Sequence, residues 1–240
     1  MFVIGRSLAN CVFCVAAFVA LGGCAGIEGG ATGGPPAPAP TFQVGDRWVY
    51  RASDGFRVPV TWEETHEVTA INADGITVRV TQVGPTVNNQ RTEIWAAPGV
   101  MRTGAVFDDE TRRFNPPLPY YKFPLTPGEH WGGWLDQFNV TLNKTAQINR
   151  YVTVNNWKKV STPAGTFDAV GLRVLMRLDD DDFWREPTQC NYLIYYAPAV
   201  GAMVRAEKDA EYWEKGERRD GIGAIRTQHA TLELVSYTRK

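Results

Sequence analysis

Hydrophobic and polar residues alternate with a period of two along most of the chain after about residue 42. Residues 76–81 alternate Ile and Val with Thr and Arg, residues 170–178 alternate Val, Leu and Met with Gly and Arg, and residues 146–154 follow the same pattern with one interruption at Arg150. A period of two places the apolar side chains on one face of a β-strand and the polar side chains on the other. The pattern therefore predicts an all-β protein whose curved antiparallel sheets roll into a sandwich or barrel.

Turn signals separate these runs. Asn72-Ala73-Asp74-Gly75 lies between two alternating segments and predicts a hairpin, and Pro163-Ala164-Gly165 predicts another turn. A helix is indicated only over residues 207–219, where Glu and basic residues are spaced four apart, and an edge hairpin explains that segment as well. We therefore expect at most one or two short helices.

Three motifs occur twice, in the same order. They are Phe42–Trp48 and Phe123–Trp131, the turns at Asp74-Gly75 and Ala164-Gly165, and Ile94–Pro98 and Ile194–Pro198. Repetition in a fixed order indicates duplication of one β unit. We expect tandem halves of about 41–115 and 120–240, whose sheets close on each other and bury both apolar faces.

A family resemblance rests on the second copy of these motifs. Phe123–Trp131, Thr162–Ala169 and Tyr195–Arg205 resemble a pattern found in uncharacterised bacterial envelope β proteins of the DUF3108/TapB-like group. The resemblance covers residues 120–206 well and 42–102 weakly. It implies a rolled antiparallel sheet of the kind that periplasmic lipoprotein carriers also use, and it implies no catalytic residues.

The N-terminus has the three parts of a secretory signal. Arg6 is the only charge among the first ten residues, an apolar stretch runs from Val12 to Leu21, and Gly22-Gly23 precede Cys24. The apolar stretch is shorter than the roughly 20 residues of a membrane-spanning helix. Leu21-Gly22-Gly23-Cys24 resembles the bacterial lipobox, which implies removal of signal peptide 1–23 and lipidation of Cys24.

This interpretation of the N-terminus predicts where the mature chain is located in the cell. Two acyl chains anchor a protein stably without a membrane-spanning helix. Residues 24–40 are rich in Gly, Ala and Pro and form the expected tether, followed by a β domain over residues 41–240. Ala25 replaces the Asp that retains lipoproteins in the inner membrane of enteric bacteria. We therefore expect a lipid-anchored protein of the bacterial envelope that faces the periplasm, on the outer membrane of a Gram-negative cell.

Charge and cysteine content further limit the binding partners and the covalent links that we expect for this protein. The chain has 25 basic and 26 acidic residues, and loss of Arg6 leaves 24 against 26, a net charge of −2. Such a chain has no basic field for nucleic acid. Of the four cysteines, only Cys190 remains after the signal and the lipidated Cys24, so no internal disulfide forms. Cys190 lies in an apolar strand pattern and is expected to be buried.

Motifs for catalysis or metal binding are sparse. Glu64 and His66 share one face of a predicted strand, which permits a carboxylate–imidazole pair, although we favour a solvated polar face. Asp179–Asp182 could attract a cation such as Ca²⁺, but the spacing of a calcium loop is absent and a solvated hairpin tip is favoured. We expect no metal ion and no cofactor.

The aromatic residues leave two interpretations open. All eight Trp follow the signal, and Tyr192, Tyr195 and Tyr196 crowd one strand. Aromatic rings on a concave sheet stack on sugars or line an acyl pocket, whereas β-propensity alone also explains rings in a core, which we favour.

Three hypotheses for function follow. The leading one is a non-enzymatic envelope lipoprotein that binds a lipid or acylated ligand on a concave apolar face. The alternative is an assembly or scaffold lipoprotein that binds another envelope protein or peptidoglycan, through an exposed sheet edge for example. The third is a glycan-acting enzyme that would use carboxylates such as Glu63, Glu64 or Glu129.

Overall fold

The computed structural model describes residues 33–179, 184–215 and 225–240. The signal peptide, the lipobox with Cys24, the first part of the tether and Asp180–Asp182 lie outside these residues. In the described part of the chain no helix is long and apolar enough to cross a bilayer.

Twelve strands make up the described fold. They are β1 (Arg47–Asp54), β2 (Val60–Asn72), β3 (Gly75–Val83), β4 (Asn88–Ala97), β5 (Val100–Ala105), β6 (Thr111–Pro119), β7 (His130–Asn139), β8 (Lys144–Thr162), β9 (Gly165–Asp179), β10 (Thr188–Ala197), β11 (Ala202–Tyr212) and β12 (Ile225–Thr238).

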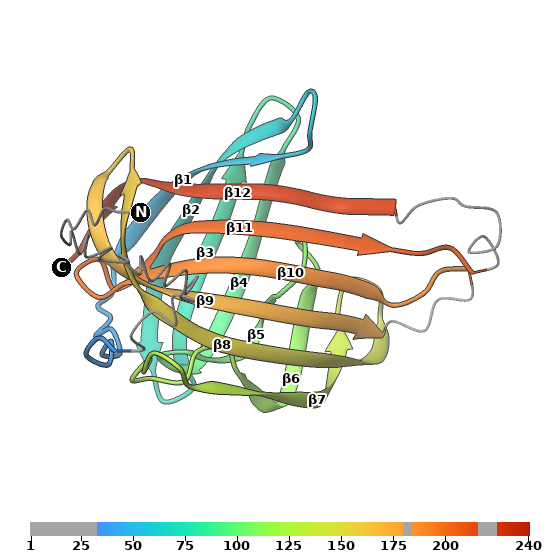
Figure 1. Ribbon diagram of the computed structural model, residues 1–240, viewed down its shortest axis with the longest axis horizontal. Coiled ribbons are helices and arrows are strands. Elements are labelled where there is room, and N and C mark those ends of the chain that lie inside the picture. The colour runs from blue at the N-terminus through green and yellow to red at the C-terminus, as the bar shows by residue number, and fades with distance from the viewer. Residues whose placement is uncertain (1–32, 180–183, 216–224) are drawn as a thin grey trace, which may run out of the picture. The chain divides into compact units, whose positions relative to one another are not determined.

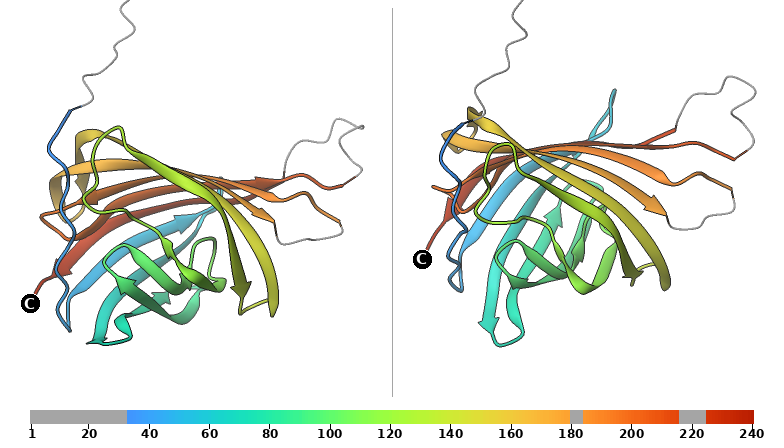
Figure 2. Two further views of the ribbon diagram at one scale, coloured as in Figure 1. Left: turned by 90° about the horizontal axis from the view of Figure 1, so that it is seen from below. Right: turned by 60° about the horizontal axis from the view of Figure 1, so that its bottom comes forward.

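Each strand pairs with the next in antiparallel orientation, and β1 pairs with β12, so the sheet closes into a barrel. Figure 1 shows β7–β12 as the front wall, and Figure 2 shows the shorter strands of the first half crossing behind it. The predicted all-β rolled architecture is confirmed. The hairpins at Asn72–Gly75 and Pro163–Gly165 join β2 to β3 and β8 to β9, as predicted.

Of the two interpretations of residues 207–219, the structure supports the strand and not the helix where it describes the segment. Residues 207–212 belong to β11, which pairs with β10 and β12, and residues 216–219 lie outside the described part. Charges spaced four apart also lie on one face of a strand, because four is a multiple of two. Val204, Ala206 and Ala210 lie on the same face of the strand and are buried in the barrel, and this burial favours a strand over a helix.

The barrel interior is the hydrophobic core. Inward positions of β9 and β10 are almost completely buried, among them Leu172, Leu178 and Ile194, while the residues between them point outward. Cys190 is buried on the inward parity of β10, which confirms its predicted environment.

The repeated motifs have the same local structure in both halves. Gly45 and Gly128 each have a φ of +92°, which glycine adopts without a Cβ clash. Their backbone N–H groups donate to the carbonyls of Val68 in β2 and Val154 in β8, at 2.8 and 2.9 Å. Each of these motifs comes just before the first strand of a set of six, β1–β6 and β7–β12.

Residues 35–42 run along one end of the barrel, and we call them the N-terminal strap (Figure 2). Ala37 is fully buried and forms a β-bridge with Leu125, with both N–H···O distances between 2.8 and 2.9 Å. Trp157 donates its indole N–H to the carbonyl of Pro35 at 2.9 Å, and Tyr196 donates its hydroxyl to Pro38 at 3.1 Å. The Pro-rich segment that the sequence places in the tether thus packs on the barrel.

Candidate functional site: a cavity with aromatic walls and a charged floor

A cavity of about 130 Å³ lies inside the barrel next to the N-terminal strap. Its walls are mainly aromatic, and its floor carries charged side chains. The aromatic residues that line it are Phe42, Trp48, Tyr50, Trp95, Tyr120, Tyr121, Phe123 and Tyr196. The charged or ionisable residues other than tyrosine are Glu64, His66, Arg91, Glu93 and Lys208.

Strand alternation and register bring the floor together. Glu64 and His66 lie two apart on β2, so both face the interior, and Glu64 pairs with Gln82 of β3. Arg91 and Glu93 of β4 share a parity in the same way and pair with Val80 and Val78. Two strands of the first half, β2 and β4, therefore supply most of the charge, and β3 lies between them.

Glu64 is the centre of this network. Its side-chain oxygens accept from His66 Nε2 at 2.7 Å, Gln82 Nε2 at 2.8 Å and Trp62 Nε1 at 3.1 Å. Burial raises the pKa of Glu64, but the His66 hydrogen bond and the positive charges around the carboxylate outweigh burial and lower the pKa well below its usual range. Glu64 therefore stays ionised, with its oxygens already occupied.

Arg91 bridges three carboxylates. Its guanidinium lies 3.1 Å from Glu93 Oε1, 2.9 Å from Asp109 Oδ1 and 3.8 Å from Glu64 Oε1. Burial lowers the pKa of Arg91, yet the three carboxylates raise it above its ordinary value. Because each acidic group at the floor has a cationic or hydrogen-bonding partner, this part of the network is electrically satisfied.

Lys208 differs from the other floor residues. It lies on the inward parity of β11, and within the described residues its ammonium has no carboxylate within 4.0 Å. The Nζ atom of Lys208 lies over the ring of Tyr192, 5.7 Å from the ring centroid. The ammonium is close enough to lower the pKa of Glu64 and Asp108 through its charge. Lys208 is thus a cation at the cavity floor that a ligand can reach without displacing an ion pair.

Hydrogen bonds link β10, β12 and the connection between β5 and β6 next to the floor. Tyr192 donates its hydroxyl to Gln228 Oε1 at 2.8 Å, and Gln228 Nε2 donates to Asp108 at 3.1 Å. Burial raises the pKa of Asp108 to about 6, and the nearby carboxylates of Glu110, Asp54 and Asp109 add to the shift.

Arg150, which interrupts the apolar pattern of β8, is a structural residue of the wall. Strands β6 and β7 share only the pairs from Arg112–Asn139 to Phe114–Gln137. Above them Arg150 donates to the carbonyls of Pro119 at 3.3 Å and Tyr120 at 3.1 Å, and burial lowers its pKa. The side chain thus replaces missing strand pairing.

The structure separates the three carboxylates of the enzyme hypothesis. Glu63 is exposed on the outer face of β2, Glu64 is buried inside, and Glu129 is exposed before β7. The predicted preference for a solvated Glu64–His66 face is wrong, because both residues face the interior. The alternation could not reveal this, since both parities of residues 61–67 carry polar side chains.

Two other expectations concern metals and sheet edges. Asp179 is the last residue of β9 and lies 3.9 Å from Arg177, while Asp180–Asp182 are outside the described residues. Among the residues that are described, no three His, Cys, Asp or Glu side chains are arranged to hold a metal ion. Closure of the described strands leaves no edge strand of the kind that the scaffold hypothesis invokes.

Sequence reasoning missed Arg91, Glu93 and Lys208. A signal for Lys208 exists, because it shares the parity of three residues that read as apolar, Val204, Ala206 and Ala210. For β4 there is no such signal, because residues 88–93 are polar on both faces.

The molecule is therefore a closed twelve-stranded barrel with a small amphipathic cavity. No known family profile matches the sequence, and no curated protein matches it. Two solved structures are similar in outline: a candidate lipoprotein from Parabacteroides distasonis (14% identity, TM-score 0.47, covering 86% of this chain and all of that one) and a candidate exported protein with a YmcC-like fold from Bacteroides fragilis (12% identity, TM-score 0.44, covering 85% of this chain and all of that one).

Proposed function

We propose that this chain is a lipid-anchored, periplasm-facing protein of the bacterial envelope whose barrel binds the anionic head of an acylated ligand without catalysing a reaction. The proposed location in the cell rests on the N-terminal signal and on Leu21-Gly22-Gly23-Cys24. The ligand class rests on the cavity. Lys208 is the observation that carries it, because an inward ammonium without an ion pair favours an anion.

The head-group argument follows from the charges of the floor. Glu64, Glu93 and Arg91 are already bonded to one another or to neighbours, whereas Lys208 forms no ion pair with a described carboxylate. An incoming carboxylate that contacts Lys208 therefore gains an ion pair without breaking one. In a site shielded from water such a pair is stronger than at the surface.

The tail argument follows from the walls and the volume. Aromatic rings bind alkyl chains by burial of apolar area. The cavity of about 130 Å³ is smaller than the roughly 300–1,000 Å³ of usual ligand pockets. A short acyl carboxylate therefore fits best.

Binding of octanoate tests the proposal. All described strands lie within residues 32–240, which form one compact unit, so this fragment is suited to detergent-free work. We expect native mass spectrometry and titration of Trp fluorescence to show octanoate bound at least about tenfold more tightly than octanol. Lys208→Gln is expected to remove that difference.

Lys159→Gln is the matched control, because Lys159 is exposed and pairs with Asp168 on the outer surface. Equal binding of octanoate by Lys208→Gln and wild type would refute the head-group role. Absence of octanoate binding into the millimolar range would refute the ligand class.

A scaffold role is the second candidate, and one surface favours it. Val58 is 91% exposed and Phe56 is 57% exposed in the connection between β1 and β2. Apolar side chains on a protruding connection indicate a partner surface. Crosslinking from position 58 in intact cells tests this role, and a single stoichiometric protein partner is the expected outcome.

A further inference from the structure

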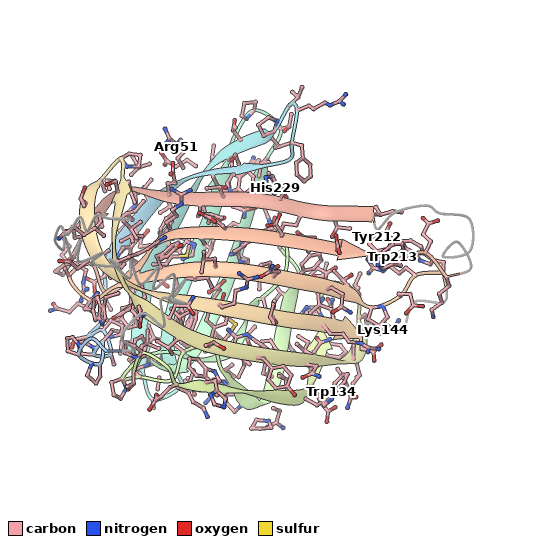
Figure 3. The ribbon with its side chains drawn as sticks, viewed as in Figure 1. Arg51, Trp134, Lys144, Tyr212, Trp213 and His229 are labelled. Atoms are coloured by element: carbon pink, nitrogen blue, oxygen red, sulfur yellow. The ribbon has the colours of Figure 1, made fainter. Side chains whose placement is uncertain are left out.

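A second hollow lies on the outside of the barrel, away from the cavity. It has a volume of about 610 Å³ and spans the outer face of β8–β12. Figure 3 shows the outer face of these strands toward the viewer, with His229 of β12 near its top and Trp134 of the neighbouring strand β7 near its bottom. The hollow is distinct from the interior cavity, because the two share no lining residue and most residues of the hollow lie on the outward parity.

Strand register arranges part of the hollow as a row across five strands. Tyr151 pairs with Leu175, Leu175 with Asn191, Asn191 with Asp209, and Asp209 with His229. Neighbouring strands lie about 4.8 Å apart, so the row is about 19 Å long. That length accommodates several units of a linear polymer.

Two exposed aromatic rings stand at the β7–β8 end of the row. Tyr151 is 55% exposed and Trp134 is 52% exposed. A side chain at position 132 would come within 2.8 Å of the Tyr151 ring, so Gly132 gives that ring its space over the sheet. Exposed rings of this kind offer flat apolar faces to a ligand.

Neutral hydrogen-bonding groups surround these rings. Asn149, Gln189 and Asn191 line the hollow, and each amide offers both donors and an acceptor. Asn149 Oδ1 has no hydrogen-bond partner within the described protein. Asp209 lies 2.6 Å from His229 Nδ1, so part of the charge in the hollow is already paired.

We propose that this hollow binds a neutral oligosaccharide. A pyranose ring has apolar C–H faces, which stack on Tyr151 and Trp134, and a rim of hydroxyl groups, which the amides bind as donors and acceptors. An anionic polymer is disfavoured, because Asp209 and Glu211 line the hollow with Arg177 as its one arginine.

An extended peptide fits less well. Strands β8–β11 pair with a neighbour on both sides, so their backbone N–H and C=O groups are used in the sheet. Strand addition, which supplies most of the affinity in peptide recognition by sheets, is therefore not open to a ligand on this face.

The test uses the full chain in a zwitterionic detergent without a sugar head group. Chitohexaose, cellohexaose and maltohexaose are titrated as neutral probes, with calorimetry and Trp fluorescence as readouts. We expect at least one probe to bind, and Tyr151→Ala to weaken its binding at least about tenfold. Trp134→Ala at the neighbouring position is a second variant, which keeps the test decisive if Tyr151→Ala does not fold.

Tyr237→Ala is the matched control, because Tyr237 is also an exposed tyrosine on the barrel but does not line the hollow. It is expected to bind like wild type, and so is Lys208→Gln, which separates this site from the interior. Failure of all three probes into the millimolar range would overturn the proposal. Unchanged binding in both Tyr151→Ala and Trp134→Ala would overturn it as well.

Discussion

Replacing Glu64 by Gln is the sharpest perturbation of the barrel interior. The substitution keeps the shape of the side chain and removes the charge that faces His66 and Arg91. It also places an NH₂ group where His66, Gln82 and Trp62 direct hydrogen bonds. At least one donor in the network then loses its acceptor.

The size of the effect follows from burial. Breaking a buried ion pair by removing one partner costs about 3–5 kcal/mol. Arg91 keeps Glu93 and Asp109 as partners, at 3.1 and 2.9 Å, so the lower end applies. We expect a loss of about 3 kcal/mol, which lowers the Tm of a domain of this size by about 6–12 °C.

The pH dependence provides an independent check. The pKa of Glu64 is lower in the folded protein than its unfolded value near 4.5. The unfolded chain therefore binds more protons between these two values, and the contribution of Glu64 is complete above about pH 4.5 and lost as the pH falls below it. The difference in unfolding free energy between wild type and Glu64→Gln is expected to be constant near neutral pH and to shrink on acidification.

Urea unfolding of residues 32–240, followed by Trp fluorescence between pH 3.5 and 8, measures both quantities. Glu63→Gln is the control, because it makes the same chemical change one residue away on the exposed face and should alter stability by less than about 0.5 kcal/mol. A Glu64→Gln protein as stable as Glu63→Gln, or a difference that grows on acidification, would refute the buried network as described.

Three further predictions concern lipidation of Cys24, the contacts of Asp46 and the hydrophobic core. Cys24→Ala is expected to abolish incorporation of labelled palmitate into the chain, and continued labelling would refute lipidation at this residue. Asp46→Ala removes the acceptor of the Gln43 N–H at 2.9 Å and the carboxylate 3.3 Å from Arg239, so thermal unfolding should show a loss of about 2–4 kcal/mol. Leu172→Ala empties a fully buried position and should cost about 2–5 kcal/mol in a urea titration, whereas loss of less than about 1 kcal/mol would contradict its place in the core.

The sequence predicts the barrel strands wherever alternate residues are apolar and the residues between them are polar. Residues 170–178 are an example, because every inward position is apolar and a register slip would expose all of them. The duplicated turn motifs are readable for a related reason, since Gly45 and Gly128 require the same backbone conformation. The fold class therefore follows from local patterns.

The residues of the cavity floor cannot be predicted from the alternating pattern. On β2 and β4 both faces carry polar residues, so alternation gives no sign of which face is inside, and only the pairing with Val78 and Val80 of β3 decides. The partners of Glu64 add to the difficulty. Arg91 lies 27 positions further along the chain and reaches Glu64 only because β3 stands between their strands.

The two sets of six strands divide the tasks of the barrel unequally. Strand β10 faces the interior with Cys190, Tyr192 and Ile194, whereas its counterpart β4 presents Arg91 and Glu93. A barrel with charges on both walls would have to desolvate all of them, at several kcal/mol for each unpaired ion. Confining most of the charge to one wall lets the apolar burial of β8–β10 offset it. We infer that the first half supplies most of the buried charge at the cavity floor, while the second half supplies Lys208 and the apolar packing that offsets the cost of burying that charge.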